Sequence, residues 1–281
     1  MKKILITGLG SYIGESFCKY LMSDGEKYHI ETVDVVGEGW KEKSFSGFDA
    51  VFHVAGIAHR KETPENRDLY YAVNTYLSRD IAKKAKTEGV GHFVFISSMS
   101  VYGMDSGIIT KDTVPTPKSN YGKSKLLAEE EILSLSDNSF RVCILRPPMV
   151  YGKGCKGNFN TVAKLVRKLP AFPLVNNKRS MIYIDNLSSF VKHIIDNGIS
   201  GIYMPQNKEY VNTSEMAKAI SEKIGKKIFL SRLLGLGVNV LKPFVKMADK
   251  AFGTLIYKET EDFDYSYCVV SNDESYKMSI D

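Results

Sequence analysis

Tyr121 and Lys125 lie four residues apart in the segment 119–125, which reads SNYGKSK. On an α-helix, residues at this spacing project from the same face, so the phenol and the ammonium group are expected side by side. A tyrosine ordinarily titrates near pH 10, and a neighbouring positive charge favours the phenolate. We therefore expect Lys125 to lower the pKa of Tyr121, and the pair to act as a general acid and base.

A glycine-rich turn follows the first apolar run of the chain. Residues 3–7 (KILIT) are typical of a buried parallel strand, and the amphipathic stretch that ends at Leu21 predicts a helix. Such a turn lets backbone amides approach a pyrophosphate at the positive end of a helix, and Gly14 lets that helix pack closely on the strand. The residues of the predicted turn are Gly8, Gly10, Ser11, Tyr12, Ile13 and Gly14.

An acidic residue closes the second predicted strand. Asp34 ends the run 30–34 (IETVD), 20 residues after Gly14. At this position a carboxylate accepts hydrogen bonds from the hydroxyls of an adenosine ribose and repels a 2′-phosphate. The sequence therefore favours NAD as the cofactor without excluding NADP.

With these features, the chain resembles the extended short-chain dehydrogenases/reductases, in the group of nucleotide-sugar epimerases and dehydratases. The resemblance covers residues 1 to about 225. Segment 93–103 (FVFISSMSVYG) matches the strand on which the family carries its catalytic serine, and in this register that residue is Ser98, with Ser97 and Ser100 close by. Ser98, Tyr121 and Lys125 are then the expected catalytic residues.

The resemblance also implies the ligand contacts. Arg179 resembles the arginine that pairs with the substrate diphosphate, a task that suits the planar fork of a guanidinium. The expected cofactor contacts are Gly8, Gly10, Ser11, Tyr12, Ile13, Gly14, Asp34, Val54, Ala55, Gly56, Asn74, Tyr121, Lys125 and Pro148. The expected contacts with a UDP-sugar substrate are Ser98, Ser100, Asn158, Phe159 and Arg179.

The chain departs from the family pattern at two places, one in the glycine-rich turn and one after the second predicted strand. Ser11 stands where the family usually has its second glycine, which predicts a longer or water-mediated pyrophosphate contact. The stretch 34–49 is too short for a full crossover helix and strand.

Strands and helices alternate along the first half of the chain. Strands are expected at 3–7, 30–34, 50–54, 92–96 and 141–145, with a helix from about 64 to 88. This order predicts an α/β fold, a doubly wound Rossmann sheet of parallel strands with a small, mostly helical C-terminal substrate region. We expect a dinucleotide-binding domain at 1–150 and a substrate-covering region at 151–281, interleaved with the first domain around 180–204. A later helix is expected to begin at the cap Asn212.

Composition places the chain among globular proteins. It has 281 residues, 43% of them hydrophobic and 25% charged, which is enough to bury a sizeable core. The net charge is +6, and the 38 Lys and Arg residues are dispersed among 32 acidic residues. A sugar-nucleotide diphosphate is therefore a sufficient anionic partner, and no nucleic acid is expected. The four cysteines show no paired spacing and are expected to be reduced, and the five histidines form no metal pattern.

No apolar run reaches the roughly 18 residues that a membrane span needs, and we expect a cytoplasmic protein.

Residues 233–241 are mostly apolar, and Lys242, Lys246 and Lys250 then recur every four residues. The default expectation is a helix packed on its own domain, and the alternative is an amphipathic helix on a membrane surface. The resemblance implies a homodimer through the helix of the Tyr-Lys pair and the helix before it. The residues Leu126, Leu127 and Ile132 could form that interface or could equally face the sheet.

The resemblance leaves the reaction open. A 4,6-dehydratase carries an Asp-Glu pair where this chain has Met99 and Ser100, which argues against dehydration. Blocks 145–152 and 179–184 look most like capsule-pathway proteins, which favours a reductase of a UDP-2-acetamido-2,6-dideoxy-4-hexulose in capsule or O-antigen biosynthesis. A UDP-hexose or UDP-HexNAc 4-epimerase with tightly bound NAD is the first alternative. A non-catalytic Rossmann protein that senses NAD or serves as a scaffold is the alternative of another class.

Overall fold

A computed structural model describes the chain except for residues 24, 26, 59, 242–245, 259–263 and 281. The chain forms two compact units, each made from several segments. Unit 1 comprises residues 1–103, 115–147 and 187–205, and unit 2 comprises residues 104–114, 148–186 and 206–281.

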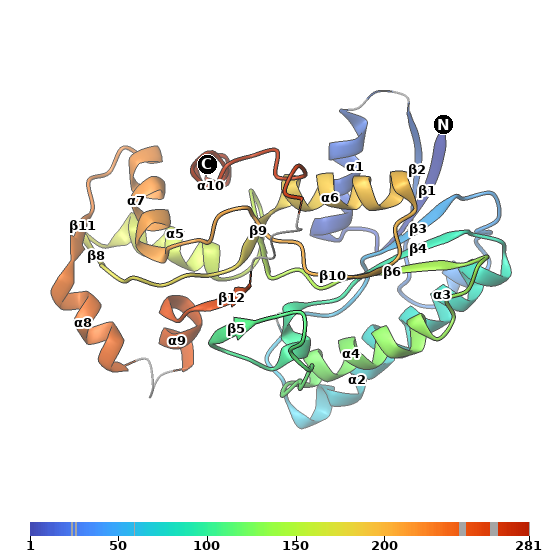
Figure 1. The fold of residues 1–281 in the computed structure, drawn as a ribbon, viewed down its shortest axis with the longest axis horizontal. Helices are drawn as coiled ribbons and strands as arrows, with labels where there is room; N and C mark the ends of the chain where they lie inside the picture. The colour runs from blue at the N-terminus through green and yellow to red at the C-terminus, as the bar shows by residue number, and fades with distance from the viewer. Residues whose placement is uncertain (24, 26, 59, 242–245, 259–263, 281) are drawn as a thin grey trace. The chain divides into compact units, whose positions relative to one another are not determined.

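Unit 1 is built on a six-stranded parallel sheet (Figure 1) with the strand order β10-β6-β4-β3-β1-β2. The five strands expected from the sequence are confirmed, and so is the doubly wound Rossmann fold; β10 is an addition. The order reverses between β1 and β3, which is where ligands bind in open α/β sheets. The strands are β1 (Lys2–Thr7), β2 (Tyr28–Val33), β3 (Ala50–His53), β4 (His92–Ile96), β6 (Arg141–Leu145) and β10 (Gly201–Tyr203).

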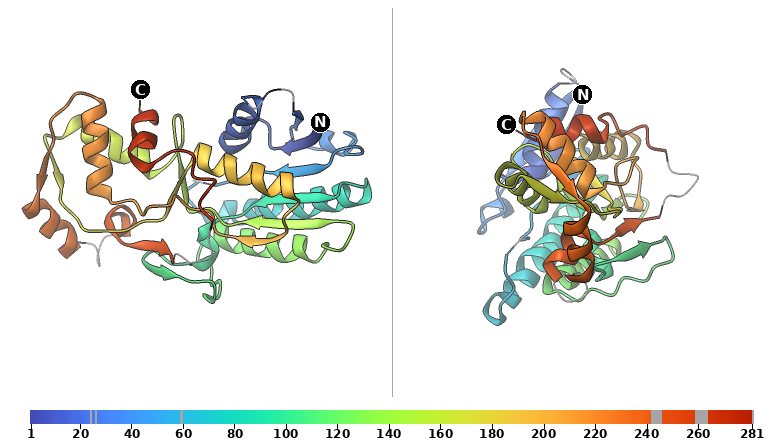
Figure 2. Two further views of the ribbon diagram at one scale, coloured as in Figure 1. Left: turned by 45° about the horizontal axis from the view of Figure 1, so that its top comes forward. Right: turned by 90° about the vertical axis from the view of Figure 1, so that its left-hand side faces the viewer.

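Helices cover both faces of this sheet. Helices α1 and α6 lie on one face, and the group α2 to α4 lies on the other (Figures 1 and 2). The bounds are α1 (Tyr12–Met22), α2 (Arg67–Tyr71), the π-helical η3 (Ala72–Leu77), α3 (Ser78–Thr87), α4 (Asn120–Leu133) and α6 (Ile184–Asn197). Three short 3₁₀ turns are η1 (Gly39–Lys41), η2 (Pro64–Asn66) and η4 (Met99–Tyr102).

The predicted helix from 64 to 88 is confirmed as a continuous but irregular path through η2, α2, η3 and α3. Its π-helical part was not expected, because a widened turn leaves no mark in the hydrophobic period. Between β2 and β3 the chain forms a single 3₁₀ turn, as the short stretch predicted.

The core of unit 1 lies between the sheet and the helices α3 and α4. Strand β4 is buried along its whole length, which explains why it reads as a continuous apolar run instead of an alternating one. Ile132 of α4 is fully buried in this core, whereas Leu126 and Leu127 are partly exposed. Trp40 of η1 closes the same core at 4% exposure.

A buried ion pair fixes α4 against the carboxyl ends of two strands. Arg146, which follows β6, contacts Glu129 of α4 through Nη2 at 2.5 Å and Nε at 3.1 Å. The exposed fractions of the two residues are 8% and 1%. Glu129 also accepts a hydrogen bond from Ser97 at the end of β4, and Arg146 Nη1 donates to the Tyr102 hydroxyl at 2.8 Å. Burial alone would lower the pKa of Arg146, but the Glu129 carboxylate raises it above its ordinary value.

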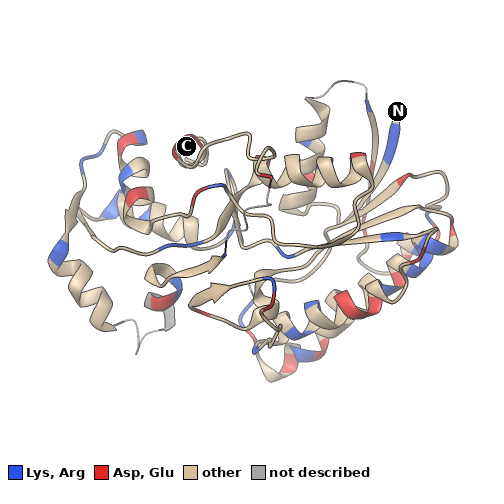
Figure 3. Cartoon of the chain, viewed as in Figure 1, with Lys and Arg blue, Asp and Glu red and all other residues tan. Residues whose placement is uncertain are grey.

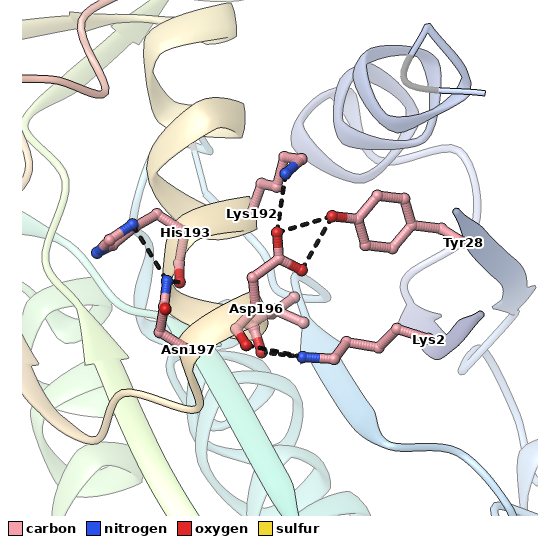
Figure 4. Close-up of polar contacts among 7 residues, drawn as sticks. Lys2, Tyr28, Lys192, His193, Asp196 and Asn197 are labelled. Carbon is pink, nitrogen blue, oxygen red and sulfur yellow. Dashed lines mark hydrogen bonds and ion pairs between the residues drawn. The ribbon is translucent and has the colours of Figure 1, made fainter. Parts of the chain in front are cut away.

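Polar contacts at the end of α6 hold the segment 187–205 to the other segments of unit 1 (Figure 4). Lys2 Nζ donates to the carbonyls of Ile195 and Asp196 at 2.8 and 3.0 Å, where the helix leaves carbonyls without helical partners. The Asp196 carboxylate accepts from the Tyr28 hydroxyl at 2.7 Å and from Lys192 at 2.8 Å. These contacts join β1, β2 and α6, although the helix lies far along the chain from both strands.

Unit 2 consists of short strands paired two by two and of surrounding helices. The pairs are β5 with β12, β7 with β9 and β8 with β11, all parallel. The predicted cap is confirmed, because the Asn212 side chain accepts from the amides of Ser214 and Glu215. The elements are β5 (Gly107–Ile109), β7 (Met149–Tyr151), α5 (Asn158–Lys168), β8 (Ala171–Pro173), β9 (Met181–Tyr183), α7 (Thr213–Lys223), β11 (Phe229–Ser231), α8 (Arg232–Leu241), α9 (Lys246–Phe252), β12 (Leu255–Tyr257) and α10 (Asn272–Met278).

The buried ion pair predicts a large loss of stability when one partner is removed. Arg146→Met leaves the Glu129 carboxylate buried without its counterion, which costs about 3–5 kcal/mol in the free energy of unfolding. Urea denaturation of the wild type and the variant measures this loss. The double variant Arg146→Met/Glu129→Leu removes both charges and should lose less than the sum of the two single substitutions. A loss below about 1 kcal/mol for Arg146→Met would contradict this role.

Candidate active site

Ser98 and Tyr121 meet at the carboxyl end of the sheet of unit 1. Ser98 lies beside the Tyr121 phenol and lowers its pKa by hydrogen bonding. Ser98 follows β4 and caps η4, where its Oγ accepts from the Ser100 amide at 3.1 Å. Tyr121 lies in the first turn of α4, and its ring packs edge-on against Tyr70 with 6.5 Å between the ring centroids. The predicted serine and tyrosine are therefore brought into direct contact.

Gly122 allows this approach. A Cβ atom on Gly122 would lie 2.5 Å from the carbonyl oxygen of Ser100 and 3.0 Å from Pro117. Any side chain here would push η4 away from α4. The glycine that follows Tyr121 in the sequence thus lets the turn that carries Ser98 contact the helix that carries Tyr121.

The N-terminus of α4 is fixed by two side chains. Ser119 Oγ accepts from the Gly122 amide at 3.0 Å, and the Glu62 carboxylate accepts from the amides of Asn120 and Tyr121 at 2.9 and 3.1 Å. A carboxylate at this end also interacts favourably with the helix dipole. Glu62 was missed from the sequence, because it lies 59 residues before Tyr121 in a segment without a motif.

Lys125 lies one turn further along α4 and is buried at 4% exposure. Its Nζ donates to the carbonyl of Ile96 at 2.8 Å and lies 4.5 Å from the centroid of the Phe95 ring. Burial lowers the pKa of Lys125 to about 7, and the charge of Glu129 opposes this shift. Lys125 therefore changes its charge near neutral pH.

The expected effect of Lys125 on Tyr121 is wrong for this structure. Burial raises the pKa of Tyr121, the hydrogen bond from Ser98 lowers it, and Tyr70 raises it further. The physical reason is desolvation of the phenolate, and the Lys125 ammonium is engaged with the Ile96 carbonyl. The two side chains do share one helix, as predicted.

The glycine-rich turn has the shape that the sequence predicted. Gly8 has φ +113°, and a Cβ there would lie 2.9 Å from the amide nitrogen of Ala55 in the loop after β3. A Cβ on Gly14 would meet the Oγ of Ser11 at 2.6 Å. Ser11 Oγ accepts from the Gly14 amide at 3.2 Å and so caps the N-terminus of α1. The serine that stands in place of the family's second glycine therefore stabilises the start of this helix. Gly10 has φ +76° and open space around it, and Tyr12 and Ile13 begin α1.

The loops after β2 and β3 complete this end of the sheet. Asp34 is exposed directly after β2, and its Oδ1 accepts from the Val36 amide at 2.9 Å. In the loop after β3, the Val54 amide donates to the carbonyl of Thr7, at the end of β1. A Cβ on Gly56 would lie 3.0 Å from Asn74 Oδ1 and 3.2 Å from Lys125 Nζ.

Asn74 is fully buried in the π-helical segment η3. Its Oδ1 accepts a hydrogen bond from the Ile57 amide at 2.8 Å. Its Nδ2 donates to the Ile57 carbonyl at 3.2 Å and to the Ser124 hydroxyl at 3.0 Å. It thereby ties the loop after β3 to α4.

These residues fit a dinucleotide at the point where the strand order reverses. The close approaches at Gly8, Gly14 and Gly56 leave no room for side chains, the capped N-terminus of α1 favours an anion, and Asp34 is accessible for a ribose.

The remaining predicted residues belong to unit 2. Pro148 is buried, and Asn158 is exposed at the first position of α5. Phe159 is 1% exposed and stacks on Tyr151 at 5.2 Å, so its side chain has no free surface for a ligand. Arg179 Nη1 donates to the Gly253 carbonyl at 3.1 Å, and its Nε is buried with no hydrogen-bond partner among the described residues. Burial lowers the pKa of Arg179, a cost that an anionic ligand would offset.

Unit 2 also contains a pocket of about 510 Å³ that holds none of the predicted site residues. It is lined by Asn176, Asn177, Lys178, Lys208, Glu209, Tyr210, Asn212, Glu215 and Tyr265. Within the described part of the chain, no group of three His, Cys, Asp or Glu side chains is placed to hold a metal ion.

The buried lysine predicts a dependence of stability on pH. The folded chain releases the Lys125 proton near pH 7, whereas the unfolded chain keeps it to about pH 10.4. Between these values the unfolded chain binds more protons, so raising the pH stabilises the fold, by at most about 1.4 kcal/mol per pH unit. Urea denaturation between about pH 7 and 10 should show this gain for the wild type relative to Lys125→Met. Parallel profiles for the two proteins would contradict the lowered pKa.

The family model described as "NAD dependent epimerase/dehydratase family" matches residues 4–204. A UDP-glucose 4-epimerase of Vibrio cholerae is 30% identical over 80% of this chain and 76% of its own length. An N-acetyl-α-D-glucosaminyl-diphospho-ditrans,octacis-undecaprenol 4-epimerase of Escherichia coli O157:H7 is 27% identical over 69% of this chain and 60% of its own.

Among solved structures, a UDP-glucuronic acid 4-epimerase from Bacillus cereus, in complex with NAD, has the same fold. Its TM-score is 0.75 at 19% identity, and the match covers 99% of this chain and 97% of that one. The matched range includes all but the first two residues of the sheet of unit 1, and it includes Ser98, Tyr121 and Lys125. The family's description bears out the expected NAD dependence. The chain belongs to the NAD-dependent epimerase/dehydratase family.

Proposed function

We propose that this protein is an NAD-dependent 4-epimerase of a hexose linked to a diphosphate, such as a UDP-hexose. The observation that carries the proposal is the placement of Ser98 next to Tyr121, on the helix that also carries the buried Lys125, at the sheet end that fits a dinucleotide. The Vibrio cholerae relative, a UDP-glucose 4-epimerase, supports this choice of reaction.

Each side chain has a role that its contacts support. The Tyr121 phenolate removes the proton of the sugar C4 hydroxyl, and the neutral phenol returns a proton to the C4 oxygen after the keto sugar has turned its other face. Ser98 donates a hydrogen bond to the same oxygen. NAD held at this site would supply the hydride acceptor and donor for C4 through its nicotinamide ring. Because burial raises the pKa of Tyr121, the positive charge of that ring is needed beside the phenol to favour the phenolate.

The diphosphate and the ribose are assigned to two other residues. Arg179 has a buried Nε without a partner in the described structure, which suits the binding of a phosphate oxygen. Asp34, exposed after β2, suits the two hydroxyls of an NAD ribose and disfavours the 2′-phosphate of NADP. The relative that acts on a diphospho-undecaprenol-linked sugar widens the substrate class from nucleotide sugars to sugars on a lipid diphosphate.

A reductase of a 4-keto sugar is the second candidate. The blocks 145–152 and 179–184, which resemble capsule-pathway reductases, favour it. The same Tyr121 and Ser98 would then protonate and hold a C4 carbonyl oxygen. A pure NAD sensor or scaffold has no physical need for Ser98, Tyr121 and Lys125 to be arranged together.

A parallel assay of the purified protein separates these candidates. We expect UDP-glucose or UDP-GlcNAc to be converted to its C4 epimer without net consumption of cofactor. Tyr121→Phe removes the acid-base group and should lower kcat by about 10²–10⁴-fold with cofactor binding retained. Stoichiometric oxidation of NADH or NADPH with a UDP-4-keto-6-deoxy-HexNAc, and no epimerisation, would replace the epimerase by the reductase. Wild-type turnover in Tyr121→Phe would refute the catalytic role.

Gly122→Ala tests whether the contact between η4 and α4 positions Ser98. The added Cβ cannot fit against the Ser100 carbonyl, so Ser98 moves away from Tyr121, and a shift near 1 Å lowers kcat by about 10²-fold. We expect the Kd for NAD to change little, because the glycine-rich turn is untouched. Lys123→Ala, an exposed neighbour on α4, is the matched control and should retain activity. Equal kcat values for the wild type and Gly122→Ala would exclude this positioning role.

A further inference from the structure

Helix α8 of unit 2 presents its apolar side chains to solvent. The exposed fractions of Leu233, Leu236 and Val240 are 81%, 61% and 68%, and these residues form one face at spacings of three and four. Leu234 and Leu241 extend the face at 46% and 52%. The sequence analysis expected a helix packed on its own domain, and α8 does rest on the end of β8, but most of its leucines remain exposed.

The reason for this orientation is Gly235, the one buried residue of α8. A Cβ at Gly235 would lie 2.1 Å from the carbonyl oxygen of Leu174, so the helix backbone rests directly on the end of β8. The helix is anchored through its smallest residue, and the larger apolar side chains point away from this contact.

The apolar surface continues onto the strands next to α8. Phe229 of β11 is 69% exposed, and its amide donates to the Pro170 carbonyl at 3.0 Å. Leu174 is 40% exposed, and its amide donates to the Ser231 carbonyl. We call the set Leu174, Phe229, Leu233, Leu234, Leu236, Val240 and Leu241 the α8 surface. Exposed apolar side chains that gather on neighbouring elements in this way are typical of an interaction site.

Basic residues flank the α8 surface. Lys227 and Arg232 are exposed on either side of β11, and Lys168 is exposed at the end of α5. In Figure 3, α8 begins at a basic residue and has no acidic residue along its length. Residues 226–250 contain six Lys or Arg and one acidic residue, Asp249. Lys242 lies outside the described residues, as does the side chain of Lys246.

We propose that the α8 surface docks the protein on an anionic phospholipid bilayer. An amphipathic helix with exposed leucines and flanking positive charges lies in the plane of the lipid headgroups, and its binding combines apolar burial with attraction to anionic lipid. A second copy of the chain fits less well, because a two-fold interface would place Lys227 and Arg232 near their own counterparts. No described helix is both long and apolar enough to span a membrane, so docking occurs at the surface.

Co-sedimentation with vesicles tests this proposal without any catalytic turnover. We expect the wild-type protein to bind vesicles of phosphatidylcholine mixed with phosphatidylglycerol, and to bind pure phosphatidylcholine vesicles more weakly. The binding should weaken with added salt. Leu233→Asp/Leu236→Asp should weaken binding to the mixed vesicles by more than about tenfold.

Met22→Asp is the matched control, because Met22 is an apolar residue that is 75% exposed on α1 of unit 1 and is not part of the α8 surface. It should bind vesicles like the wild type, and all three proteins should convert a water-soluble UDP-sugar equally. Equal vesicle binding by the wild type and the α8 double variant would overturn the proposal. The proposal would also be overturned if light scattering showed the wild type and Met22→Asp to be dimers and the α8 double variant to be a monomer. The α8 surface would then bind a second copy of the chain.

Discussion

The buried pair of Glu129 and Arg146 is the interaction on which the arrangement of the active site depends. Tyr121, Lys125 and Glu129 follow one another at intervals of four along α4, so they share one face of the helix. Glu129 is held by Ser97 at the end of β4 and by Arg146 after β6. Because Glu129 is held in place, the rotation of α4 about its axis is fixed. The positions of Tyr121 and Lys125 on the same face are then fixed as well.

The same constraint determines the electrostatics of the site. A helix held this tightly on the sheet carries Lys125 into a space between the Ile96 carbonyl and the Phe95 ring, where the charged ammonium is poorly solvated. The pKa of the lysine falls to about 7, and that of Tyr121 rises, because burial penalises both charged forms. The Glu129 carboxylate limits the fall for Lys125. One buried carboxylate thus positions the catalytic helix and tunes the charge on it.

The sequence predicted what short-range patterns encode. The apolar runs gave the five strands at the correct places, and the Tyr-Lys spacing gave two side chains on one helix. It did not reveal Glu62, nor the pairing of Glu129 with Arg146, because contacts between distant segments leave no periodic signal. The direction of the Tyr121 pKa was wrong because it depends on burial, which spacing alone does not specify. In α8 the apolar pattern was visible, but it did not reveal that the buried residue is Gly235, which rests on the Leu174 carbonyl.

The most direct test of the account follows the hydrogen atom at C4. Purified protein with NAD is given UDP-glucose that carries deuterium at C4, and the product is examined by mass spectrometry and NMR. Oxidation and reduction at C4 through the nicotinamide predict that the C4 epimer forms with its deuterium retained. Release of the label into solvent during epimerisation would contradict hydride transfer at C4, and with it the role assigned to Tyr121 and Ser98.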